Sequence, residues 1–249
     1  FEVFTSLDIP TYYFCTSSAS SLSALLSLPK THQIILEKIK DPNTSIEFPG
    51  VPPISTPDLP GPFHDTEGIA YKGLFSAAIN MAKSAGILTN TCHAFEPRAV
   101  KAISDGLCTP NLPTPSVYCI GPIVANSGDD HEHKCLRWLD SQPSRSVVFL
   151  CFGSMGLFKA EQLMEMAIGL EKGGHRFLWV VALALEESEI GFVSADELEK
   201  RVGELMDSVS GKGVRERLRE MRDCAKAARG DGGSSRVALA ELVESWKDG

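Results

Sequence analysis

One strand–turn–helix–strand unit constrains the fold of this chain more than any other stretch. Residues 146–152, "SVVFLCF", form a short apolar run typical of a central strand that is buried on both sides. A glycine turn, "GSMG" (153–156), leads into a helix over about 159–172, and a second strand is expected over 176–181. Two consecutive strands joined by a crossover helix run parallel, so this stretch predicts a parallel α/β sheet.

Strand and helix patterns also alternate in the first half of the chain. Strands are expected over 9–17, 86–91 and 116–122, and helices over 18–28, 71–85 and 96–107. Residues 41–65 carry seven prolines, so we expect a long ordered surface loop there, of the kind that lines a site. The alternation predicts another parallel α/β domain.

A polar, charged segment separates the two halves. Residues 124–134 have the composition of a linker, which places one domain at 1–123 and a second at 135–249. His131 and His133 lie among acidic neighbours in this linker. Flexible linkers seldom hold ligands to the tolerance that a metal needs, so we interpret the cluster as a solvated charge run and predict no metal site.

The second domain has an irregular junction after its last strand. Nine apolar residues run from Phe177 to Leu185 and pass directly into acidic residues, with no turn residue between them. Two parallel strands do not make a stable sheet. The sequence therefore predicts a domain whose middle is missing near residues 181 and 182.

The tail after this junction, residues 194–249, is expected to be helical. Ser194 with Glu197 forms a capping-box pattern at the start of its first helix. Further amphipathic helices are expected over 214–229 and 234–247.

Composition narrows the function classes. The chain has 249 residues, 43% of them hydrophobic, and a formal net charge of −8, which disfavours nucleic-acid partners because no basic surface could neutralise phosphates. Seven scattered cysteines without a C-x-x-C pair indicate reduced thiols and a cytoplasmic protein. No run of 18 apolar residues occurs, so no membrane span is predicted.

Several segments together resemble the plant family-1 UDP-glycosyltransferases. They occur in the order of that family and include "IPTYYFCTSSA", "FPGVPPISTPDLP", "GILTNTCHAFEPRAVKAI", "VYCIGPIV" and "CLRWLDSQPSRSVVFLCFGSMGLF". The resemblance implies an α/β fold, here an incomplete GT-B-like pair of Rossmann-like domains. It also implies an inverting transfer of a hexosyl group from a UDP-sugar to a hydroxyl of a small phenolic such as a flavonoid.

The resemblance assigns few site residues. Gly153, Ser154 and Met155 match the turn that meets the donor diphosphate, where backbone N–H groups and a helix N-terminus hold anions. His64, at the end of the proline-rich loop, is the candidate acceptor-side residue. UDP-sugar is the donor substrate and no cofactor is implied. The family's catalytic histidine and its partner aspartate would precede this chain, so no catalytic residue is assigned.

The family's donor-sugar signature, with W-C-P-Q and H-C-G-W-N-S, does not occur in the sequence. Three hypotheses therefore stay open. The chain is a glycosyltransferase with impaired or absent activity, or a non-catalytic fragment of a truncated or mis-spliced gene, or an unrelated Rossmann-type nucleotide binder. The last is disfavoured because no G-x-G-x-x-G fingerprint with a later acidic residue occurs.

Overall fold

A computed structural model describes residues 1–124, 134–153, 158–180 and 192–247. The chain forms two compact units, the first made of Phe1–Ala125 with Met221–Gly249 and the second of Asn126–Glu220. The first boundary falls inside the predicted linker, which itself lies almost wholly outside the described residues. The final 29 residues pack with the first unit, although the sequence-based division placed them in the second domain.

The first unit is built on a three-stranded parallel sheet with the order β1-β4-β5. Tyr12 pairs with Gly86, and Gly86 pairs with Ser116. The elements of this part of the chain are α1 (Glu2–Ser6), β1 (Tyr12–Cys15), α2 (Ala19–Leu26), α3 (Leu28–Lys38), α4 (Ile69–Ala82), β4 (Gly86–Thr89), α5 (Pro97–Ser104) and β5 (Ser116–Cys119). The predicted alternation of strands and helices is confirmed here, with boundaries shifted by a few residues.

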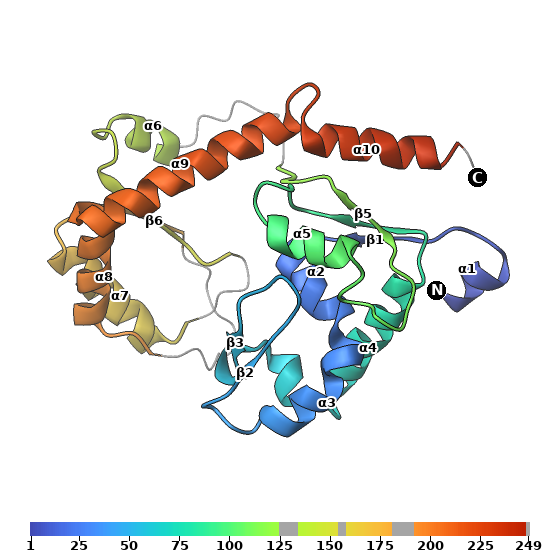
Figure 1. Cartoon of the computed structure of the whole chain (residues 1–249). Helices are drawn as coiled ribbons and strands as arrows, with labels where there is room; N and C mark the ends of the chain where they lie inside the picture. The colour runs from blue at the N-terminus through green and yellow to red at the C-terminus, as the bar shows by residue number, and fades with distance from the viewer. Residues whose placement is uncertain (125–133, 154–157, 181–191, 248–249) are drawn as a thin grey trace. The chain divides into compact units, whose positions relative to one another are not determined.

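Helices cover this sheet from both sides. Buried side chains of α2, α4 and α5 form one core with Ile87 of β4. Helix α10 (Ser234–Ser245) packs against β5, and in Figure 1 the sheet lies between α10 and the pair α2 and α5. The indole of Trp246 meets the ring of Tyr12 edge-on, with centroids 5.7 Å apart.

The proline-rich loop is folded rather than extended. It contains the antiparallel pair β2 (Ser45–Ile46) and β3 (Ile54–Ser55) and two short 3-10 helices, η1 (Thr56–Asp58) and η2 (Gly61–His64). Most of its residues lie at the surface, as expected, but it also supplies buried side chains to a second core that includes residues of α3 and α4. These loop residues are Ile46, Phe48, Leu59 and Phe63.

The second unit holds the two-stranded parallel sheet β6-β7. Its elements are α6 (Lys134–Asp140), β6 (Val147–Cys151), α7 (Ala160–Lys172), β7 (Arg176–Val180) and α8 (Ala195–Asp207), followed by α9 (Val209–Arg229), which contains the second unit boundary. Val148 and Leu150 of β6 pack against α7 and α8.

Strand β6 is buried on one face only. Its alternate residues Val148 and Leu150 are buried, whereas Phe149, on the other face, is 62% exposed. Phe152, just after the strand, is 43% exposed. We expected the apolar run 146–152 to be buried on both sides, and that expectation is wrong. The physical reason is that α7 and α8 cover one face, while no described element of this unit covers the other.

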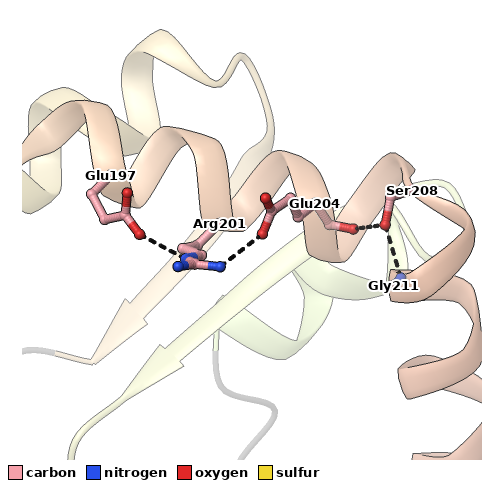
Figure 2. A network of polar contacts seen from close by, with 5 residues as sticks. All are labelled: Glu197, Arg201, Glu204, Ser208 and Gly211. Carbon is pink, nitrogen blue, oxygen red and sulfur yellow. Dashed lines mark hydrogen bonds and ion pairs between the residues drawn. The ribbon is translucent and has the colours of Figure 1, made fainter.

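Helix α8 begins at the predicted cap, but only half of the capping box forms. The Ser194 side chain accepts a hydrogen bond from the Glu197 N–H at 3.3 Å. The Glu197 carboxylate instead pairs with Arg201 at 2.7 Å, and Arg201 also pairs with Glu204 at 3.1 Å (Figure 2). All three side chains are well exposed, so this network contributes little to stability.

The turn between α8 and α9 is tied by Ser208. Its hydroxyl donates to the Glu204 carbonyl and accepts from the Gly211 N–H at 2.9 Å, as Figure 2 shows. This places a serine cap at the start of α9, which begins earlier than the predicted residue 214. Among the described residues, no helix has the length and apolarity needed to cross a membrane.

Candidate functional site

The predicted donor turn joins β6 to α7. Strand β6 ends at Cys151, and Gly153 follows two residues later with φ +70°. A left-handed φ of this kind favours glycine, and a Cβ at this position would meet nothing within 4 Å. Backbone conformation, not crowding, therefore selects glycine here. Ser154 and Met155 lie outside the described residues, so their role stays a prediction.

Side chains on either side of the turn bring its ends together. The rings of Phe152 and Phe158 meet edge-on with centroids 4.7 Å apart. Helix α7 then begins after Lys159 without a side-chain cap, so its first N–H groups are left to other acceptors. Glu161 in the first turn already supplies a negative charge near this end. The helix end is therefore suited to an anion, but Glu161 opposes a highly charged one.

Two polar side chains of α7 fix the chain where it re-enters the described structure after the junction. Gln162 donates to the Val193 carbonyl at 2.8 Å and accepts from the Val193 N–H at 2.6 Å. Glu165 accepts from the Ala195 N–H at 2.6 Å. The start of α8 is thus held on α7 by paired hydrogen bonds, although residues 181–191, including the predicted splice point, lie outside the described residues.

The carboxyl ends of parallel strands are where α/β folds usually bind ligands, and in the first unit Glu96 organises this edge. Its carboxylate accepts from the N–H groups of Ala19 at 2.8 Å and Ser20 at 2.9 Å, at the start of α2. It also accepts from the Thr91 hydroxyl at 2.8 Å. A carboxylate at a helix N-terminus satisfies free N–H groups and complements the helix dipole.

The electrostatics of Glu96 follow from these contacts. Burial alone would raise the pKa of its carboxyl group. The hydrogen bonds from Ser20, Thr91 and Ala19 favour the ionised form and outweigh burial, so the pKa lies below its ordinary value. Glu96 therefore remains a charged anchor for the α2 terminus rather than a proton donor near neutral pH.

Two cysteines near the same edge are protonated thiols. Burial raises the pKa of Cys119 to about 11, helped by the nearby Cys92 and Glu96. Burial also raises the pKa of Cys92. Because the thiolate is the nucleophile, neither residue is set up for nucleophilic catalysis.

His64, the predicted acceptor-side residue, ends η2. Its Nε2 lies 3.1 Å from the Leu59 carbonyl oxygen of the same loop, and its side chain is exposed. The contact identifies a role in holding the loop conformation. The acceptor role of His64 stays a prediction.

Glu96 and Gln162 were not singled out by sequence reasoning. Glu96 stands directly before Pro97, which opens α5, and this Glu-Pro pair at a helix start is the only local signal. Its partners Ala19 and Ser20 are more than 70 residues away in the sequence. Contacts of this kind carry no periodicity that a sequence pattern could reveal.

No family model matches the chain. The chain does match curated relatives. The chain is 37% identical to UDP-glycosyltransferase 88B1 of Stevia rebaudiana, covering 99% of this chain and 73% of the relative. It is 36% identical to an anthocyanidin 5,3-O-glucosyltransferase of a Rosa hybrid cultivar, covering 99% of this chain and 72% of the relative.

Solved structures also resemble this chain. The chain is 30% identical to Phytolacca americana UGT2 complexed with UDP-2fluoro-glucose and pterostilbene, with a TM-score of 0.87 over 99% of this chain and 73% of that one. The parallel sheets and their glycine turn thus define a partial GT-B glycosyltransferase fold. The chain belongs to the plant UDP-glycosyltransferase family, which confirms the resemblance seen in the sequence.

The alignments also reveal a gap. The match to the Stevia relative spans 339 aligned positions, which exceeds the 249 residues of this chain by 90. At least 90 positions inside the matched span of the relative therefore have no counterpart here. This agrees with the absence of the donor-sugar signature from the sequence.

Proposed function

We propose that this chain derives from an enzyme that transfers a hexosyl group from a UDP-sugar to a hydroxyl of a small plant phenolic, with inversion at the anomeric carbon. The observation that carries the proposal is the 36–37% identity, over 99% of the chain, to two named glycosyltransferases, one of them an anthocyanidin glucosyltransferase. The bound molecules of the Phytolacca structure, UDP-2fluoro-glucose and pterostilbene, support both substrate classes.

In this proposal the two units divide the substrates. The first unit provides acceptor contacts near the carboxyl ends of β1 and β4, where the Glu96 carboxylate holds the start of α2. The second unit provides the turn Gly153–Met155, whose N–H groups would hold the donor diphosphate and stabilise UDP as it leaves. Glu96 is a positioning residue in this scheme, because it acts through α2.

We further propose that the chain as it stands does not transfer sugar at a detectable rate. The donor-sugar signature is absent, and at least 90 internal positions of the relative have no counterpart. Positioning of two reactants supplies as much as about 7–11 kcal/mol of barrier lowering. One glycine turn with a single serine cannot hold a UDP-sugar in that geometry.

The test compares the chain with a repaired version. The chimaera is this chain with the Rosa relative's matching segment inserted between residues 181 and 182. Calorimetry measures UDP binding by the native chain, by the relative and by this chimaera. They are then incubated with UDP-glucose and a flavonoid panel, and products are identified by mass spectrometry. We expect UDP binding by the chimaera and the relative, and neither binding nor product from the native chain.

Ser154→Ala in the chimaera should weaken UDP binding, whereas Ser104→Ala, at an exposed position on α5, should leave it unchanged. Saturable UDP-glucose turnover by the native chain would contradict the loss of activity. A chimaera that does not bind UDP would contradict the role of the Gly153–Met155 turn.

We also propose a cytoplasmic location. The seven cysteines are all unpaired, as expected in a reducing compartment. A fluorescent fusion imaged in plant cells tests this, and accumulation in the secretory pathway would contradict it.

A further inference from the structure

A cavity of about 380 Å³ opens between α3 and α4 in the first unit. His32 of α3 lies on one side, and Tyr71, Phe75 and Ile79 of α4 lie on the other. Its volume is within the range of about 300–1,000 Å³ typical of small-molecule sites. None of the residues assigned to sugar transfer lines it.

A partly buried hydrogen bond sets the polar character of this cavity. His32 Nδ1 lies 2.8 Å from the hydroxyl of Tyr71, a residue that is only 1% exposed. Burial raises the pKa of Tyr71, so the phenol stays protonated and either donates to the imidazole or accepts from it. Among the described residues, Nε2 of His32 has no hydrogen-bond partner. Nε2 is a donor in one tautomer and an acceptor in the other.

The walls favour a flat and uncharged molecule. The ring of Phe75 meets His32 edge-on with centroids 5.3 Å apart, and the Tyr71 ring lies 5.7 Å from His32. The two charged residues of the wall, Glu67 and Lys72, pair with each other at 3.0 Å and are both well exposed to solvent. Thr66 and Ser76 also line the cavity, and the rings of His32 and Phe75 favour planar aromatic ligands by stacking and edge contacts.

We propose that this cavity binds a small planar phenol, with the phenol hydroxyl bonded to Nε2 of His32. A hydroxyl is the group that suits this nitrogen, because it both donates and accepts and so fits either imidazole tautomer. The site is separate from the acceptor position of the transfer reaction. It gives the chain a second phenol site that does not depend on an intact donor domain.

The test uses 7-hydroxycoumarin and the full chain labelled with ¹³C at isoleucine methyl groups. We expect a saturable shift of the Ile79 methyl signal, because a bound aromatic ring would lie beside it. Ser76→Trp, at an exposed position of the cavity wall, should abolish the shift by filling the cavity. Ser104→Trp, at an exposed position on α5, should preserve it.

The hydroxyl contact is tested separately. 7-Methoxycoumarin, which cannot donate a hydrogen bond, should bind roughly threefold to tenfold more weakly than 7-hydroxycoumarin. In the double variant His32→Phe with Tyr71→Phe, which removes both partners of this hydrogen bond and keeps an aromatic ring at each position, the two coumarins should bind equally.

Three results would overturn the proposal. They are an unchanged Ile79 signal up to the solubility limit of the ligand, a shift that Ser76→Trp does not remove, or a hydroxyl preference that survives in the double variant. Because the readout is local to α4 and needs no UDP-sugar, failure here is distinguishable from failure of the proposed transfer function.

Discussion

The two parallel sheets of this protein differ in what surrounds them. In the first unit β4 pairs on both edges, with β1 and β5, and its Ile87 is fully buried. In the second unit β6 and β7 pair only with each other among the described strands, and Phe149 at the middle of β6 is 62% exposed.

The difference is not one of strand sequence. Strand β6, "VVFLC", is more apolar than β4, "GILT", yet it is the less buried of the two. Burial on both faces requires covering layers and neighbouring strands, which parallel sheets normally obtain from several β-α units. The comparison shows a complete layered core in one unit and a core with one open face in the other.

The largest expected effect contrasts the central residues of the two strands. Ile87→Ala removes a fully buried side chain and should lower the free energy of unfolding by about 2–5 kcal/mol. Phe149→Ala removes a larger but exposed side chain and should change it by no more than about 0.5 kcal/mol. Urea unfolding followed by circular dichroism measures both. Equal losses would mean that the open face of β6 is covered in solution.

A smaller effect is expected where the second unit is tightly packed. A Cβ on Gly169 of α7 would lie 2.6 Å from the Ala195 carbonyl oxygen, so Gly169→Ala must push α7 and α8 apart and should cost about 1–3 kcal/mol. Gly203 of α8 has open space around it, and Gly203→Ala should instead stabilise by about 0.4–1 kcal/mol. Thermal unfolding separates the two variants. If Gly169→Ala left the unfolding temperature unchanged, the covered face of this unit would also be loosely packed.

Glu96 makes the first unit sensitive to acid. Its pKa is lowered in the folded state, so its stabilisation is present above the ordinary glutamate pKa of about 4.3 and is lost as pH falls through the lower folded value. Glu96→Gln should reduce stability at pH 7 by about 1–2 kcal/mol and flatten the loss of stability between pH 5 and pH 3.

The matched control for this pH experiment is Glu47→Gln, at an exposed position of the same unit, which should change neither quantity. Unfolding midpoints measured at several pH values decide the outcome. An unaltered pH dependence in Glu96→Gln would show that the contacts to Ala19 and Ser20 do not form in solution.

The smallest effect is expected at the ion pairs of α8. Arg201→Ala breaks both contacts drawn in Figure 2, yet all the partners are well exposed and screened by water. We expect no measurable shift of the unfolding midpoint at physiological salt. A clear loss of stability would mean that this surface is less hydrated than its exposure indicates.

Much of the local structure follows from sequence patterns. The alternation of apolar strands with amphipathic helices predicted β1, β4 and β5 and the helices α2, α4 and α5, because these periodicities reflect local geometry. Helix α3 was not predicted. The Ser194 cap was predicted from one residue and its neighbours. The order of motifs also indicated the family, which the relatives confirm.

What the sequence by itself determined is therefore the main strands and helices of the α/β pattern, their parallel arrangement and the family. Tertiary structure alone decided which faces are covered, since β6 remains open although it is the more apolar strand. It also decided that Glu96 caps α2 and that the last helix packs with the first unit. The physical reason is that burial and long-range hydrogen bonds depend on which distant segments meet, and local periodicity carries no information about that.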